Sequence, residues 1–230
     1  GMSALEIGSD IGASIRNPAH YCGVYGHKPT YGVVPYTGHM LPGTVMPSDI
    51  TVAGPLARSA RDLSVMLKVL AGTDGVEARG LNVALPAATQ KSLKEFRVAV
   101  KVNSAVSDVD QPVRDKINEL AGFLQRRVKK LSFEAQPAFS DEEAYENFIT
   151  LLRATATRKM SDADYESSVS KSRTLAPDDK SYVAMMTRAF ALSHRDWLRA
   201  NERRHEMRLL WDQFFNDWDV LLCPAAASAA

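Results

Sequence analysis

The sequence has few cysteines, few histidines and almost no excess charge. Its 230 residues include 2 cysteines and 5 histidines, and 28 basic residues against 27 acidic ones give a formal net charge of +1. Two cysteines do not make a disulfide scaffold and are typical of a reducing compartment, so we expect a cytoplasmic protein. The near-zero charge does not indicate a nucleic-acid surface, so we expect no nucleic-acid partner.

Long apolar runs and cofactor motifs are also missing. No apolar run is long enough to span a bilayer, and no signal-peptide pattern opens the sequence, so we expect no membrane partner. Cys22 and Cys223 are far apart, and no group of His, Cys and carboxylate residues has zinc-like spacing. Neither a Walker-type loop nor a dinucleotide fingerprint is present. The sequence therefore predicts no metal and no cofactor.

One serine lies in an unusual cluster of small residues. Residues 8–19 read GSDIGASIRNPA, with Ser14 near the centre. Acyl transfer by a serine needs a base and hydrogen-bond donors aimed at the developing oxyanion, and a loop of small residues lets backbone N–H groups approach. Asp10 can hold such a loop through hydrogen bonds to its backbone, and Arg16 can pair with a carboxylate. The alternative interpretation of this short segment is a Gly/Ser turn without a catalytic role.

The longer pattern resembles the amidase signature family. The resemblance rests on the residues above and on CGVYGHKPTYGVVP at 22–35, DITVAGPLARSARDL at 49–63 and WDVLLCP at 218–224. It implies that Ser14 is the nucleophile, and that the backbone N–H groups of Ile11, Gly12, Ala13 and Ser14 form the oxyanion hole. Ala13 departs from the glycine usual in the family. Asn17 and the region 41–43 look more like the general amidase branch than the amidotransferase branch.

The resemblance also implies catalytic residues that the chain does not match. In the family, a lysine acts through a second serine, and both precede the nucleophile, whereas only GMSALEI precedes Gly8 here. We therefore expect a chain truncated at its N-terminus, and at its C-terminus, that is inactive by itself. No histidine is placed in a triad-like motif to substitute, and Lys28 occupies a structural position. The histidines are His20, His27, His39, His194 and His205.

The predicted fold class is α/β, with a mixed β-sheet core covered by helices, as a partial amidase signature fold. We expect a single domain over residues 1–230, with a loop-heavy nucleophile region at 1–72 and a helix-rich remainder with few strands at 73–230. Ser59 predicts the start of a helix. Apolar residues then recur at helical spacing, and Gly72 predicts the end of this helix. Further helices are expected from 110 to about 128, and over 141–158 and 161–173, and a long helix or a helix pair is expected over 179–216. Strands are expected at 96–102 and 131–135, and a short buried strand at 218–224. Val113, Ile117, Leu120, Leu124 and Val128 should form the buried face of the first of these helices.

Three functions remain open from the sequence. The first is an amidase that cleaves a small-molecule amide through an acyl-enzyme on Ser14. The second is a non-catalytic amidase-like remnant or interaction module, and the third is a component of an amidotransferase. We also expect a homo-oligomer, most simply a two-fold dimer, which covers surface that a truncated sheet exposes. The aromatic residues between 190 and 215 are interpreted as core rather than as a ligand pocket.

Overall fold

The computed structural model describes residues 2–40 and 42–229, which divide into two compact units. Unit 1 comprises the described residues up to Lys91 together with the short segment that begins at Ala225. Unit 2 comprises Ser92–Pro224. The predicted single domain, with its regions 1–72 and 73–230, stays a prediction.

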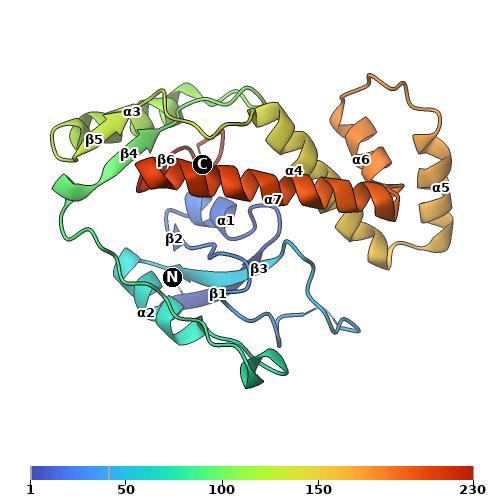
Figure 1. Ribbon diagram of the computed structural model, residues 1–230, viewed down its shortest axis with the longest axis horizontal. Helices are drawn as coiled ribbons and strands as arrows, with labels where there is room; N and C mark the ends of the chain where they lie inside the picture. The colour runs from blue at the N-terminus through green and yellow to red at the C-terminus, as the bar shows by residue number, and fades with distance from the viewer. Residues whose placement is uncertain (1, 41, 230) are drawn as a thin grey trace. The chain divides into compact units, whose positions relative to one another are not determined.

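Unit 1 is built on a small antiparallel sheet. Strand β1 (Leu5–Asp10) and the short strand β2 (Tyr25–Gly26) both pair with β3 (Val52–Ala57), in the order β1-β3-β2. Gly8 lies opposite Gly54, and Asp10 lies opposite Val52. Figure 1 shows β1 and β3 running side by side. Strand β3 is buried along most of its length and is the core of the unit, whereas β1 is an edge strand with exposed side chains.

Short helices complete this unit. Helix α1 (Arg16–Tyr21) lies between β1 and β2 in the chain, and α2 (Ala60–Leu70) follows β3 directly. The Ser59 side chain caps α2 by accepting a hydrogen bond of 3.1 Å from the N–H of Asp62, as its position in the sequence predicts. The 3₁₀ helix η1 (Glu77–Arg79) comes next along the chain.

Unit 2 contains a parallel sheet of three strands with one strand at its centre. Strand β4 (Arg97–Val100) pairs on one side with β5 (Lys130–Ser132) and on the other with β6 (Val220–Leu222). Because side chains alternate along a strand, Val98 and Val100 pack with Ala121 of α3 (Gln111–Gln125), while Ala99 packs with aromatic residues at the end of the chain's longest helix. The core of the unit therefore lies on both faces of β4.

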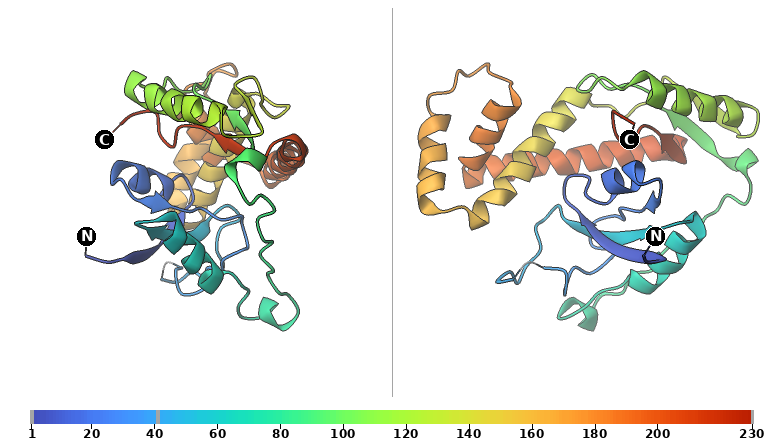
Figure 2. Two further views of the ribbon diagram at one scale, coloured as in Figure 1. Left: turned by 90° about the vertical axis from the view of Figure 1, so that its left-hand side faces the viewer. Right: turned by 180° about the vertical axis from the view of Figure 1, so that it is seen from behind.

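The remaining helices of unit 2 pack against one another. They are α4 (Asp141–Ala156), α5 (Asp162–Ser172), α6 (Tyr182–Phe190) and α7 (His194–Asp217), with 3₁₀ turns η2 (Leu93–Glu95) and η3 (Thr157–Lys159). Helix α4 contacts α6 and α7, and α6 contacts α5; Figure 2 shows this group from two further directions. Each of these four α-helices begins with a serine whose side chain accepts a backbone N–H, which is why the helices start where they do.

The α/β class is confirmed, and the structure corrects several details. The described strands form two three-stranded sheets, and β1 and β3 lie in a region expected to be mainly loop. Leu120 is 42% exposed although it was expected to be buried, and Ala121 takes the core position instead. The predicted helix or helix pair over 179–216 is two helices, α6 and α7. In β6, which was expected to be buried, Val220 is 39% exposed because the strand lies at an edge of the sheet.

Candidate active site

Ser14 lies in a tight turn between a strand and a helix. Strand β1 ends at Asp10, helix α1 begins at Arg16, and the residues between them form bends and turns. Ser14 is exposed, whereas the next residue, Ile15, is completely buried. The turn therefore places a serine hydroxyl at the surface immediately beside a rigid anchor.

Asp10 holds the turn together from inside. Its carboxylate is completely buried and accepts hydrogen bonds from the backbone N–H groups of Ala13 at 2.8 Å, Ile15 at 3.2 Å and Arg16 at 3.4 Å. The Arg16 side chain adds a bidentate contact, with Nε at 3.0 Å from Oδ2 and Nη2 at 2.9 Å from Oδ1. A carboxylate that satisfies several backbone donors at once fixes the path of a loop. The predicted loop-supporting positions of Asp10 and Arg16 are thus brought together by the structure.

The environment of Asp10 keeps it ionised. Burial by itself would raise the pKa of the carboxyl, but hydrogen bonds from Arg16 and from the N–H groups of Ala13 and Ile15, together with the charge of Arg16, lower the pKa to about 2. The carboxylate is therefore negative over the whole neutral range.

Ala13 has a backbone conformation that disfavours a side chain. Its φ is +89°, and it is the one residue other than glycine with positive φ in the described ranges 2–40 and 42–229. A Cβ in this region clashes with the backbone, which is why glycine is the usual occupant. Alanine at position 13 therefore introduces local strain next to Ser14.

The turn also exposes backbone donors. Within the described part of the chain, no group accepts a hydrogen bond from the N–H of Ile11, Gly12 or Ser14, whereas the N–H of Ala13 is engaged by Asp10. Three of the four predicted oxyanion donors thus have no partner within the described chain, and their role in binding an oxyanion stays a prediction. The N–H of Ala13 instead donates a hydrogen bond to Asp10 and is not one of these donors without a partner.

Close packing beneath the turn involves residues that the sequence did not single out. A Cβ added to Gly54 in β3 would lie 2.2 Å from the His27 carbonyl oxygen and 2.7 Å from Cδ of Pro29. The His27 N–H also donates to the Pro55 carbonyl at 2.9 Å. Glycine at position 54 therefore lets the segment around His27 lie directly against β3. The Gly-Pro pair within an apolar run was the available signal, because it marks a close backbone approach in a strand.

No basic side chain forms a hydrogen bond with the Ser14 hydroxyl in the part of the chain that the structure describes. His20 Nε2 instead lies 2.9 Å from the Ser228 carbonyl, and the rings of His39 and His194 contact Tyr36 and Trp197. The expectation that no histidine forms a triad with Ser14 stays a prediction.

His27 and Lys28, which follow the turn in the sequence, are two half-buried basic residues whose pKa values their surroundings lower. Burial lowers the pKa of Lys28, the charge of Arg16 lowers it further, and the charge of Asp10 opposes this change. Burial also lowers the pKa of His27. Lys28 is therefore electrostatically coupled to the Asp10–Arg16 pair.

Metal-binding clusters and membrane-spanning helices are both missing from the part of the chain that the structure describes. No group of three or more His, Cys, Asp and Glu side chains in residues 2–40 and 42–229 is arranged to hold a metal ion. In the same residues, no helix is both long and apolar enough to cross a membrane.

The strand, turn and small-residue serine loop agree with the likeness of the whole sequence to known proteins. The sequence profile of the Amidase family matches residues 1–230, and the chain belongs to this family. It is 30% identical to the A subunit of glutamyl-tRNA(Gln) amidotransferase from Gloeothece citriformis, over 98% of this chain and 50% of that protein. A protein of the same name from a Synechococcus species is 31% identical over 100% of this chain and 50% of its own length.

Solved structures share the fold. A bacterial aryl acylamidase of the amidase signature family matches with a TM-score of 0.70 at 20% identity, over 100% of this chain and 47% of its own. Fatty acid amide hydrolase matches with a TM-score of 0.67 at 22% identity, over 99% of this chain and 40% of its own. At this level of identity the likeness shows the fold alone. The chain spans about half the length of the relatives it matches.

Proposed function

We propose that this chain carries the nucleophile and oxyanion-binding part of an enzyme that cleaves carbon–nitrogen amide bonds. The observation that supports the proposal is the turn after β1, where Ser14 is exposed beside the unengaged N–H groups of Ile11, Gly12 and Ser14 itself. Membership of the Amidase family gives the reaction class.

The proposed chemistry proceeds in two stages. Ser14 Oγ attacks the amide carbonyl carbon, and the carbonyl oxygen becomes an oxyanion that the backbone donors stabilise. The C–N bond then breaks, the amine leaves with a proton, and an acyl ester remains on Ser14. Water attacks this ester, which releases the carboxylic acid and returns the proton to Ser14.

We further propose that the 230-residue chain by itself turns over simple amides slowly. No described lysine or histidine hydrogen-bonds to Ser14, so none of these side chains assists the removal of the proton from the Ser14 hydroxyl. Acid–base assistance contributes about 10²–10⁴-fold to such reactions. With a typical enzyme kcat of about 10 s⁻¹, the expected rate is roughly 10⁻³–10⁻¹ s⁻¹. Release of 4-nitroaniline from 4-nitroacetanilide measures it, and a rate near 10 s⁻¹ that needs Ser14 would contradict the proposal.

Covalent labelling tests the nucleophile without requiring turnover. A fluorophosphonate reacts with an activated serine by losing fluoride, and the adduct is located by mass spectrometry of peptides. An oxyanion hole without its base retains part of its catalytic effect, so we expect slow labelling at Ser14. The Ser14→Ala variant should lose the adduct, and the Ser3→Ala variant, which removes an exposed serine of the same unit, should keep it. Absence of an adduct on Ser14 would favour the non-catalytic interaction module.

Amide transfer is a second candidate. It is favoured by the relatives at 30% and 31% identity, whose names are those of an amidotransferase component. The same acyl-enzyme would form, with ammonia as the leaving group and its delivery to an acceptor as the later step. Ammonia release from glutamine, compared with aniline release from an aryl amide on the same preparation, separates the two candidates.

A further inference from the structure

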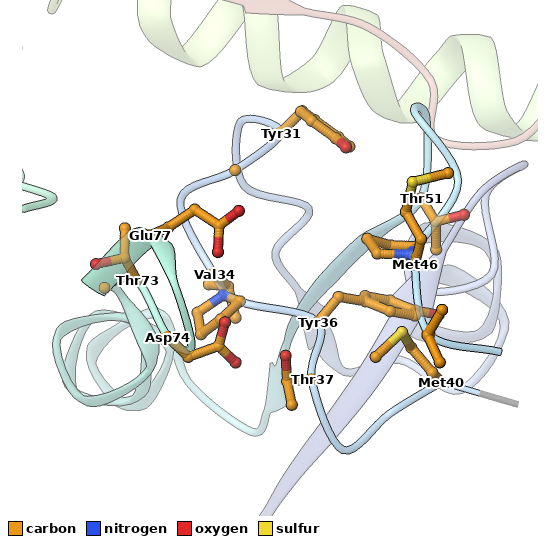
Figure 3. Close-up of a pocket in the computed structure, with 15 residues that line it drawn as sticks. Tyr31, Val34, Tyr36, Thr37, Met40, Met46, Thr51, Thr73, Asp74 and Glu77 are labelled. Carbon is orange, nitrogen blue, oxygen red and sulfur yellow. The ribbon is translucent and has the colours of Figure 1, made fainter. Parts of the chain in front are cut away.

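Unit 1 contains a cavity that the proposed chemistry does not use. It has a volume of about 310 Å³, close to the lower end of the range for small-molecule sites, which is about 300–1,000 Å³. Its lining comes from residues between Tyr31 and Met40, from residues 45–47, from Thr51 and from residues between Gly72 and Glu77, which all belong to one compact unit. Figure 3 shows the cavity with its lining side chains.

One side of the cavity carries negative charge. Asp74 and Glu77 both line it, and Figure 3 shows their side chains on the same side. Neither carboxylate forms a hydrogen bond or ion pair with any of the described residues. Arg79 follows in the same 3₁₀ helix but does not line the cavity. Two carboxylates without a protein cation favour a positively charged ligand.

The other side is apolar and aromatic. Tyr36, Met40 and Met46 lie there in Figure 3, across from the carboxylates, and Tyr31 contributes a second phenol ring. Aromatic faces attract organic cations, and methionine side chains adapt to apolar groups of different shape. Only a ligand with a hydrocarbon part can also bury apolar surface against this wall, so the lining favours a ligand that has both a charged and an apolar part.

We propose that this cavity binds an organic ammonium ion, with its charged group at Asp74 and Glu77 and its hydrocarbon part against Tyr36, Met40 and Met46. The site is separate from the Ser14 chemistry, and binding does not require that Ser14 act as a nucleophile.

Binding is tested on the Ser14→Ala variant with three probes of nearly equal size. Phenethylammonium is the cation, 2-phenylethanol is the neutral analogue and phenylacetate is the anion. For so small a cation we expect a dissociation constant of about 1 mM or below, with the alcohol at least about tenfold weaker and no binding of the anion. Methionine labelled with ¹³C at its methyl group gives a local readout. The signals of Met40 and Met46 should shift on titration, while that of Met207, buried in α7, should not.

Charge-neutralising variants locate the ammonium group. Asp74→Asn and Glu77→Gln should each weaken phenethylammonium about fivefold, as expected for a partly exposed ion pair. Glu134→Gln, which neutralises an exposed carboxylate in unit 2, should change nothing. Glu77 is exposed, so its variant keeps the test valid if Asp74→Asn fails to fold. Equal binding of the alcohol, no shift of Met40 and Met46, or unchanged affinity in both cavity variants would each overturn the proposal, whatever the result of serine labelling.

Discussion

Replacing Ala13 by glycine should stabilise the protein, although glycine usually destabilises. The φ of +89° puts the Ala13 Cβ in a strained conformation, and a left-handed conformation costs an L-residue about 1–2 kcal/mol. Glycine removes this strain but gives the unfolded chain more freedom, which costs about 0.5–1 kcal/mol. The balance is a gain of about 0.5–1 kcal/mol for Ala13→Gly, which corresponds to about 1–4 °C in Tm for a chain of this size.

Thermal and urea unfolding of Ala13→Gly measure the effect, with Ala88→Gly as the matched control. Ala88 is an exposed loop residue of the same unit and has no positive φ, so its replacement should lower stability by about 0.5–1 kcal/mol. The two alanine-to-glycine changes are thus expected to act in opposite directions. If Ala13→Gly lowers Tm as much as Ala88→Gly, the positive φ of Ala13 does not destabilise the folded state by the expected amount of about 1–2 kcal/mol.

Four further results are expected. Asp10→Asn should destabilise unit 1 by about 3 kcal/mol in urea unfolding, because Arg16 and the loop N–H groups lose their anionic partner; an unchanged midpoint would contradict the role of Asp10. The lowered pKa of Asp10 means that its stabilisation of about 2 kcal/mol is complete above its ordinary pKa near 4 and is lost as the pH falls through about 2; unfolding midpoints in acid should show this loss in wild type and not in Asp10→Asn. Gly54→Ala should cost about 1–3 kcal/mol or more because its Cβ meets the His27 carbonyl, whereas Gly80→Ala, which meets nothing within 4 Å, should change little. The exposed side chains of Leu5 and Ile7 on edge strand β1 favour pairing with a second copy, so light scattering should give twice the 25.3 kDa chain mass, and Ile7→Lys should restore the monomer.

Helix positions were predictable because each depends on nearby residues. Ser59 and Ser140 cap helices through a backbone N–H three residues later, and both signals are local in the sequence. The strand over 97–100 was also recognisable from its buried valines. Strand β1 was not, because only its pairing with β3 makes the segment Leu5–Asp10 regular, and that partner lies far along the chain, at Val52–Ala57.

The site shows the same division between local and distant information. The sequence places Ser14, Asp10 and Arg16 in one loop, and the structure brings their groups into one hydrogen-bonded turn. What the sequence could not provide is the direction of each N–H group, because direction depends on backbone angles. The role of Gly54 also escaped, because a contact between β3 and the His27 segment exists only after the sheet has formed.

The strain at Ala13 and the availability of the oxyanion donors have a common geometric origin. Along the turn, the N–H groups of Ala13 and Ile15 point to Asp10, while that of Ser14 between them has no acceptor in the described chain. An extended strand also alternates its N–H groups, but it places residues i and i+2 about 6.6 Å apart, which is too far for one carboxylate to accept well-aligned hydrogen bonds from both. The positive φ at Ala13 is therefore part of what lets the N–H groups of Ala13 and Ile15 share Asp10 and leaves the Ser14 N–H between them without an acceptor in the described chain. Glycine adopts the same angle without strain, so Ala13→Gly should keep this direction while it raises stability. Serine labelling at an unchanged rate in the more stable variant would therefore show that the geometry of the turn, and not its strain, serves Ser14.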